Sequence, residues 1–279
     1  RENGINRISF GLQSTVKEEL EYLGRIHTYE EFLQSFDWAR QAGFLNINVD
    51  LMSAVPKQTL TSYEENLRKI AKLSPEHISA YSLIIEEGTP FYEDNKLEEL
   101  LPSEEDEVLM YRMTEKILNE YGYDKYEISN YAKPGKECRH NIGYWTEVAY
   151  LGLGLGASSY MEGCRFTNEK DLDKYLALDF GEEDPEKRET ALRKLWGQIE
   201  ELSQAQRMEE FMFLGLRMLK GVSDVDFVRL FGVKMETVYG DVIRRLTANG
   251  LLKKEENNLA LTEWGMDVSN FVLSEFLLG

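Results

Sequence analysis

Polar side chains that can hold a ligand recur on one side of three strand-like stretches. Gln13, Asp50 and Tyr81 each lie late in a run that alternates polar and apolar residues. Side chains two positions apart in a strand share a face, so each of these residues continues a polar face of its run. An amide, a carboxylate and a phenol on neighbouring faces can together hydrogen bond a polar ligand. The pattern therefore predicts a ligand-holding surface made by several strands.

A second group of chemically useful residues occupies the segment from Cys138 to Trp145. It places His140, Asn141, Tyr144 and Trp145 within six residues, and we interpret the segment as a loop. A flat aromatic macrocycle could stack on the aromatic rings and take the histidine as an axial iron ligand. The alternative is a histidine that caps a loop beside a packed tryptophan. Both interpretations stay open on these residues alone.

Metal and disulfide chemistry has little support in the sequence. The three histidines, His27, His77 and His140, include no pair at the spacing of a helical zinc site. The two cysteines, Cys138 and Cys164, are too few for a disulfide framework or for an iron–sulfur site made by cysteine alone. We therefore expect a cytoplasmic protein without a zinc centre.

The segment 151–157 alternates leucine with glycine. No Lys-Ser or Lys-Thr follows it, so it lacks the residues that a phosphate-binding P-loop needs. A period of two fits a strand, and glycines on one strand face let a flat ligand or another backbone come close. We predict that the segment is a last strand of the sheet, and that its glycine face borders the ligand-holding surface.

The elements that must position these residues follow from periodicity. We predict strands at 7–13, 45–52, 77–85 and around 125–129, with helices at 29–42, 60–73 and 104–121 between them. Such alternation implies right-handed crossovers and a parallel sheet. Because one face of each strand is polar, we expect a curved α/β sheet with helices outside and a polar interior. A flat sheet with one solvated face is the alternative.

The C-terminal part has a different character. Residues 180–190 form a charged connector, and helices are predicted after Ser203, at 223–231 and at 237–249. Residues 251–262 fit a hairpin, and a last helix follows. This order is a winged-helix-like α+β arrangement, which either recognises DNA or serves as a docking or lid module. We divide the chain into 1–165, a connecting segment 166–202, and 203–279.

Charge and composition exclude several classes of protein. The chain has 279 residues, of which 42% are hydrophobic and 29% charged, as in a folded globular protein. Its net charge of −18 disfavours nucleic acid, which is bound through Lys and Arg. The docking or lid interpretation of the C-terminal module is therefore preferred to DNA binding. We found no apolar run of membrane-spanning length and no signal peptide.

Six segments in combination carry a resemblance to a known family. They are the runs at 4–14, 23–27, 46–52, 77–83 and 126–135, and the His-Asn-x-x-Tyr-Trp motif at 140–145. With them the chain resembles the HemW branch of the radical-SAM family, which is related to the oxygen-independent coproporphyrinogen III oxidases. The resemblance covers nearly the whole chain.

The resemblance implies a fold, cofactors and a function. The fold is a partial, truncated radical-SAM β/α barrel, and the cofactors are S-adenosylmethionine and a four-iron–four-sulfur cluster. The implied function is that of a haem chaperone, which binds haem or porphyrin and delivers haem to membrane-bound respiratory enzymes. Oxidative decarboxylation of coproporphyrinogen propionates is the enzymatic alternative, and a winged-helix regulator is a remote third one.

Matched position by position, the resemblance implies S-adenosylmethionine contacts at Gln13, Arg25 and Asp50. Asp50 would accept hydrogen bonds from ribose hydroxyls, and Arg25 would pair with the methionyl carboxylate. For Arg25 a surface salt bridge is the alternative. Further contacts are expected near Ile84 and at the Ala157–Ser158 turn. The residues expected at haem are His140, Asn141, Tyr144 and Trp145.

One departure from the family pattern concerns the cluster. Radical-SAM proteins ligate it through Cys-x3-Cys-x2-Cys, and no such motif occurs here. The chain also starts with Arg and leaves the first edge of its predicted sheet open. We therefore expect that the first hundred or so residues of a parent protein are absent. In that case this chain holds no cluster, carries no catalytic residue and reduces no S-adenosylmethionine.

Overall fold

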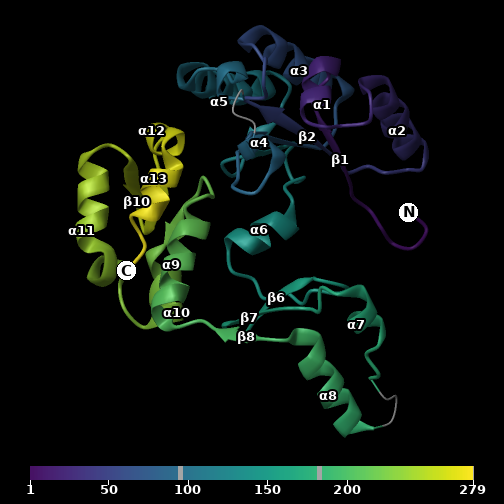
Figure 1. Cartoon of the computed structure of the whole chain (residues 1–279). Helices are drawn as coiled ribbons and strands as arrows, with labels where there is room; N and C mark the ends of the chain where they lie inside the picture. The colour runs from purple at the N-terminus through teal and green to yellow at the C-terminus, as the bar shows by residue number, and fades with distance from the viewer. Residues whose placement is uncertain (94–96, 181–183, 279) are drawn as a thin grey trace. The chain divides into compact units, whose positions relative to one another are not determined.

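The computed structural model describes residues 1–93, 97–180 and 184–278. The chain forms two compact units, Arg1–Cys138 and Arg139–Gly279 (Figure 1). Each unit has its own sheets and helices, which are described separately below. A finer division of the sequence at residues 165 and 202 stays a prediction.

The first unit is built on a five-stranded sheet of order β1-β2-β3-β5-β4. The strands are β1 (Ile8–Gln13), β2 (Ile47–Ser53), β3 (His77–Ser82), β4 (Asp124–Lys125) and β5 (Asn130–Ala132). The helices are α1 (Lys17–Tyr22), α2 (Tyr29–Gln41), α3 (Leu60–Leu73), α4 (Pro90–Glu93) and α5 (Glu104–Glu120), with a 3-10 turn at Glu98–Leu100. Strands β1, β2 and β3 run parallel, as the alternation of strands and helices predicts.

The helices of this unit begin where their sequences carry capping residues. Thr28 accepts the backbone N–H of Glu31 and the Glu31 side chain accepts the backbone N–H of Thr28, which closes a capping box before α2. Thr59 and Ser62 form the same reciprocal pair before α3. These caps fix the residue at which each of the two helices begins.

One face of the sheet is apolar and covered by helices. Ile47, Val49 and Leu51 of β2 are fully buried there. Residues of the same cluster come from α2, α3 and α5, among them Phe32, Phe36, Leu67, Ile70, Met110 and Leu118. The intervening strand residues make the opposite, polar face, as the period of two predicts. The described residues form an open sheet and no closed barrel, which agrees with the expected partial barrel.

The predicted fourth strand around 125–129 is wrong. The structure places two short strands, β4 and β5, on either side of a turn, and both pairings in which β5 takes part are antiparallel. The physical reason is the buried Glu127, whose Oε1 accepts the N–H of Ser129 at 2.9 Å and the amide of Asn130 at 2.5 Å. A carboxylate that accepts local donors in this way favours a turn over a continuous strand.

The second unit contains two three-stranded sheets, of orders β6-β7-β8 and β10-β11-β9. The strands are β6 (Ser158–Met161), β7 (Cys164–Thr167), β8 (Ile199–Glu201), β9 (Val222–Ser223), β10 (Leu252–Glu255) and β11 (Asn258–Leu261). The first helices are α6 (Arg139–Trp145), α7 (Leu172–Leu176) and α8 (Pro185–Trp196). The later helices are α9 (Gln204–Gly215), α10 (Asp224–Phe231), α11 (Met235–Ala248), α12 (Glu263–Asp267) and α13 (Ser269–Ser274).

The end of this unit has the predicted winged-helix-like arrangement. Helices α9, α10 and α11 precede the β10–β11 hairpin, and β9 pairs with β11 as the third strand. The charged connector predicted at 180–190 is corrected in part, because α8 begins at Pro185 with Asp184 as its N-cap. Residues 181–183 of that connector lie outside the described residues.

Two further predictions for the second unit are wrong. The segment around His140 is a short helix, α6, and not a loop. The glycine–leucine segment 151–157 is a loop and not a strand: Gly154 and Gly156 have φ of +102° and +65°, outside the strand region. The buried Asn168 amide donates to the carbonyls of Gly152 and Gly154 and holds this loop in place.

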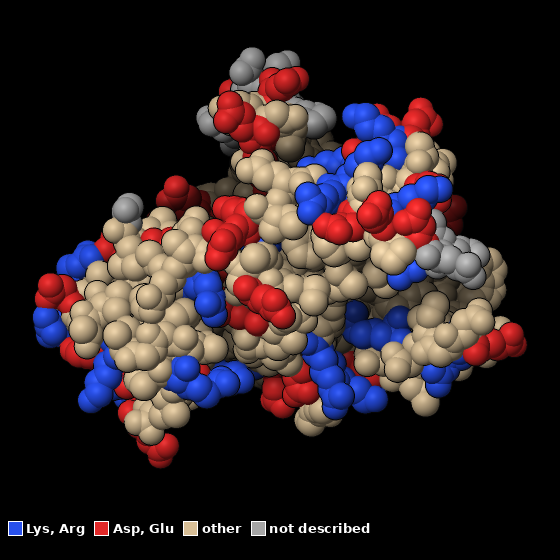
Figure 2. Space-filling model, turned by 90° about the horizontal axis from the view of Figure 1, so that it is seen from below, with Lys and Arg blue, Asp and Glu red and all other residues tan. Residues whose placement is uncertain are grey.

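In the described part of the chain, no helix combines the length and the hydropathy that a bilayer span requires. Figure 2 shows one face of the molecule, where small groups of Lys and Arg lie between groups of Asp and Glu. On that face the basic side chains are divided by acidic ones, which is the surface that the net charge of −18 leads one to expect.

Candidate functional site

The polar face of the first unit brings the predicted residues Gln13 and Asp50 together. A Cβ atom added at Gly11 would lie 3.3 Å from Nε2 of Gln13 and 4.0 Å from Oδ2 of Asp50. Glycine at this position therefore leaves a space that both side chains border. The Tyr81 hydroxyl donates to Oε1 of Gln13 at 3.1 Å and closes one side of the group.

Gln13 has an unusual backbone at the end of β1. Its φ is +72°, and the register between β1 and β2 shifts between Phe10 and Gln13. A bulge of this kind re-aims a side chain at the end of a strand. The Gln13 side chain is buried, and its amide nitrogen has no hydrogen-bond partner among the described residues. The bulge thus presents a free donor beside the Asp50 carboxylate.

Asn48 holds Asp50 in position from the side. Its amide nitrogen donates to Oδ1 of Asp50 at 2.6 Å and to the hydroxyl of Ser9 at 2.7 Å. Its carbonyl oxygen accepts from Ser79 at 3.2 Å and from Nδ1 of His77 at 2.5 Å. Asn48 is almost fully buried, and its amide makes four hydrogen bonds.

The partners of Asn48 determine the tautomer of the buried His77. Because Asn48 offers its carbonyl oxygen, Nδ1 of His77 carries the proton and Nε2 accepts. The Tyr126 hydroxyl donates to Nε2 over 2.8 Å and itself accepts the backbone N–H of Cys138 over 3.3 Å. Burial, and to a lesser degree the charge of Arg7, lower the His77 pKa to about 3. The imidazole is therefore neutral and acts as a fixed spacer between Tyr126 and Asn48.

The environment of Asp50 pulls its pKa in two directions. Burial raises the pKa above the ordinary value, while hydrogen bonds from Asn48, Ser79 and Ser9 and the charge of Arg7 lower it, and burial has the larger effect. The Asp50 carboxylate is half-buried and already accepts hydrogen bonds from Asn48 and Ser9. Its remaining lone pairs can accept hydrogen bonds from hydroxyl groups of a ligand.

The other predicted S-adenosylmethionine contacts are placed less centrally. Arg25 is exposed in the loop between α1 and α2, and its charge lowers the pKa of Tyr81, which puts it within electrostatic reach of the group. Ile84 follows β3 and its side chain is 72% exposed. Ala157 and Ser158 belong to the second unit, where Ser158 begins β6. The roles of all these residues stay predictions.

The residues present do not fit an iron–sulfur cluster. Among the described residues, no group of three or more His, Cys, Asp or Glu is placed to hold a metal ion. Cys138 is buried at the end of the first unit, and Cys164 is half-buried in β7 of the second. Accordingly no step through a cluster is derived for these residues.

Helix α6 separates the four residues predicted to contact haem into two sets. The exposed His140 packs edge-on against Tyr144 at 4.7 Å between ring centroids, and Tyr144 packs in the same way against Tyr150 at 4.8 Å. Trp145 instead lies under the guanidinium of Arg217, 4.4 Å from its ring centroid. Asn141 is half-buried. An exposed imidazole with an aromatic neighbour remains available to a flat ligand.

Asn48 shares a polar strand face with Asp50, and His77 shares one with Tyr81, but the pattern of residues does not predict that His77 takes part in the site. Tyr126 was not singled out, although its position in the 126–135 run was part of the resemblance. The available signal was the shared face of Asn48 and Asp50, because residues two apart in a strand can hydrogen bond along it. Tyr126 gave no such signal, since its contact with His77 spans 49 positions.

Comparisons with known proteins agree with this fold. The model of the radical SAM superfamily matches residues 1–100, and the model of the HemN C-terminal domain matches residues 202–268. The solved structure of coproporphyrinogen III oxidase (HemN) from Escherichia coli, a radical SAM enzyme, superposes with a TM-score of 0.77. It is 21% identical, and the match covers all of this chain and 65% of that one, so it shows a shared fold.

Curated relatives are more similar in sequence. The heme chaperone HemW of Bacillus subtilis is 37% identical over 278 residues, which are 99% of this chain and 71% of that protein. The heme chaperone HemW of Lactococcus lactis is 36% identical over 99% of this chain and 70% of its own length. That of Haemophilus influenzae is 31% identical over 98% of this chain and 68% of its own length.

The polar strand ends, the sheet with its covering helices and the C-terminal domain together define a radical-SAM protein of the HemN type. Sequence similarity to the HemW relatives over nearly the whole chain identifies the family within this class. The chain belongs to the HemW family of heme chaperones.

Proposed function

We propose that this chain binds S-adenosylmethionine on the polar face of its first unit and handles haem with its second. The observation that carries the first part is the open space at Gly11, bordered by the Gln13 amide and the Asp50 carboxylate. Asp50 accepts the ribose hydroxyls, the Gln13 amide nitrogen donates beside it, and Arg25 pairs with the methionyl carboxylate. S-adenosylmethionine supplies a sulfonium-bound ribose, and these residues bind and orient it.

The hydrogen-bond network behind Asp50 supports this part of the proposal. The Asn48 amide donates a hydrogen bond to one oxygen of the Asp50 carboxylate. The neutral His77 donates to the Asn48 carbonyl oxygen and so keeps this amide from rotating. The carboxylate is thereby oriented before a ligand arrives, which lowers the entropy that binding costs. Asp50 and Gln13 are therefore presented as a rigid pair.

Equilibrium dialysis with labelled S-adenosylmethionine tests this site. Asp50→Asn should weaken binding about tenfold, the effect of losing a hydrogen bond to a charged group. Asp124→Asn, an exposed aspartate on β4 of the same unit, is the matched control and should leave binding unchanged. Equal affinity of the wild type and Asp50→Asn would show that the polar face is not the site.

For haem, we propose that His140 provides an axial ligand and Tyr144 a stacking surface. The names of the HemW relatives support haem as the ligand, and the exposed imidazole beside Tyr144 supports the residue. Delivery to membrane-bound respiratory enzymes is the remaining part of this proposal. In a spectroscopic titration, His140→Ala should shift the Soret band of the complex, while His27→Ala should not. Unchanged Soret spectra in both variants would exclude His140.

A second candidate function is oxidation of coproporphyrinogen III, favoured by the shared fold with HemN. The same polar face would hold S-adenosylmethionine in either case, so the substrate separates the two functions. An anaerobic assay with coproporphyrinogen III on a full-length protein that carries this chain decides between them. Turnover to protoporphyrinogen would replace the chaperone function with the enzymatic one.

A further inference from the structure

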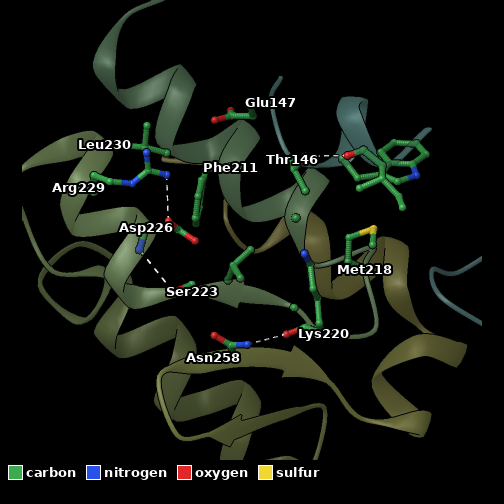
Figure 3. A pocket seen from close by; sticks show the side chains of 15 residues that line it. Thr146, Glu147, Phe211, Met218, Lys220, Ser223, Asp226, Arg229, Leu230 and Asn258 are labelled. Carbon is green, nitrogen blue, oxygen red and sulfur yellow. Dashed lines mark hydrogen bonds and ion pairs between the residues drawn. The ribbon is translucent and has the colours of Figure 1, made fainter. Parts of the chain in front are cut away.

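The second unit contains a pocket of about 510 Å³ that no residue of the predicted sites except Trp145 lines (Figure 3). The end of α6, helices α9 and α10, and strands β9 and β11 surround it. Its volume lies within the range of roughly 300–1,000 Å³ found for small-molecule sites. The pocket is formed entirely by residues of one unit.

One end of the pocket carries a carboxyl group and the other an ammonium group. Figure 3 shows Glu147 on one side and the Lys220 side chain on the other, with Phe211 and Met218 among the residues of the wall. Lys220 is exposed, and its ammonium group forms no ion pair among the described residues. Arg229, by contrast, is paired with Asp226 at 2.9 Å. Lys220 is thus the cation of this pocket that is available to a ligand anion.

The Glu147 end offers a different surface. Oε1 of Glu147 is buried, and none of the residues that the structure describes forms a hydrogen bond with it. Burial and the nearby Glu210 raise the Glu147 pKa to about 7, while Arg207 and Arg165 lower it. Glu147 also raises the pKa of Tyr160 from β6. At neutral pH this carboxyl group is therefore partly uncharged and tolerates an apolar neighbour, whereas a ligand anion is directed to Lys220.

The wall between the ends combines apolar side chains with polar ones, among them Thr146, Ser223 and Asn258. Phe211 and Met218 come from α9 and from the turn after it, Val222 from β9, and Trp145 lies beside them with its indole N–H buried and unpartnered. A wall that joins large apolar side chains to polar groups suits an amphipathic organic molecule. The pattern fits a flat apolar body that carries a carboxylate at one edge.

We propose that this pocket binds the carboxylate edge of an apolar organic acid through Lys220 and, resting on the proposed haem handling, that the acid is a propionate-bearing tetrapyrrole. The propionate pairs with the Lys220 ammonium at the mouth. The ring edge contacts Phe211 and Met218, and the opposite, uncharged edge faces Glu147. The pocket thereby sets the orientation of the macrocycle.

Titration of the full chain with haem and with haem dimethyl ester tests the pocket. Lys220→Gln should weaken haem binding about tenfold without moving the Soret band, because it removes a charged contact and not a ligand of the iron. The ester, which lacks the carboxylates, should bind wild type and Lys220→Gln equally. Lys253→Gln, an exposed lysine on β10, is the matched control and should change neither affinity.

The outcomes separate the pocket from the proposed function. Haem binding that is equal in wild type and Lys220→Gln, with His140→Ala still shifting the Soret band, overturns the pocket and leaves haem handling in place. Equal affinity of the wild type for haem and its ester also overturns the pocket. Absence of haem binding by the wild type overturns both. Because Lys220 is exposed, the substitution should leave the thermal unfolding midpoint unchanged, and this is measured alongside.

Discussion

The network around Asn48 in the first unit and the pocket of the second unit differ in how their buried polar groups are satisfied. Around Asn48 each amide atom makes two hydrogen bonds within the chain. Around the pocket, Trp145 and Glu147 keep buried polar atoms without partners. A satisfied network is rigid and costly to break, whereas unpartnered groups cost stability until a ligand meets them. The first region is thus organised in advance, and the second is completed on binding.

Removing the centre of the satisfied network should have the largest effect. Asn48→Ala leaves His77, Ser79 and Asp50 without their shared partner, and we expect a loss of about 3 kcal/mol in the free energy of unfolding. Urea denaturation measures it. Asn46→Ala is the matched control, since the Asn46 side-chain oxygen has no partner and its removal should cost less than about 0.5 kcal/mol. Similar losses of unfolding free energy in Asn48→Ala and Asn46→Ala would show that the hydrogen bonds of Asn48 do not make it special.

The next effect is expected from His77, whose lowered pKa should make the free energy of unfolding depend on pH. Its folded-state pKa of about 3 lies below the ordinary 6.5, so the unfolded state binds more protons between these values. Stability therefore falls as pH drops below 6.5, by about 1.4 kcal/mol per pH unit from this group. His77→Gln should remove this slope between pH 6.5 and 5. An identical slope in the variant would mean that His77 is accessible to protons in the folded state.

Glu147 should show the opposite sign. Its folded-state pKa of about 7 lies above the ordinary 4.5, so the folded state binds more protons in that window and stability falls as pH rises through it. At about 1.4 kcal/mol per unit of pKa difference, Glu147→Gln should therefore stabilise the protein by about 3 kcal/mol at pH 8 and by nothing below pH 4. Glu162→Gln, an exposed glutamate that also has a left-handed backbone, should change nothing at either pH.

The smallest effect is expected where a polar atom already lacks a partner. Trp145→Phe removes the unpartnered indole N–H and keeps a ring under Arg217, so its effect should stay within about 0.5 kcal/mol. Tyr126→Phe also removes one polar group, but it leaves Nε2 of His77 and the N–H of Cys138 without their hydrogen-bond partner. We expect it to lower the free energy of unfolding by about 1–2 kcal/mol. Thermal unfolding of both variants compares them. A larger loss for Trp145→Phe would reverse the contrast.

Much of the first unit could be predicted from the sequence because its patterns are local. Alternation of polar and apolar residues placed Gln13, Asp50 and Tyr81 on one face, and helical spacing placed Phe32 and Phe36 against the other. Both patterns follow from the fixed direction of successive side chains in strands and helices. The same period of two misled at 151–157, because the glycines there take backbone conformations that a strand does not allow.

The sequence alone determined the three parallel strands of the first unit and their faces, the charge of the chain and the family that its motifs resemble. Only the tertiary structure decided which polar groups meet: His77 with Tyr126, Asn48 with Asp50, and Lys220 with the pocket. The reason is that a face is set by neighbouring residues, whereas a partner is set by the register between strands and by turns far apart in the chain. Register and turns depend on the packing of the whole unit, and this packing cannot be predicted from a local pattern of residues.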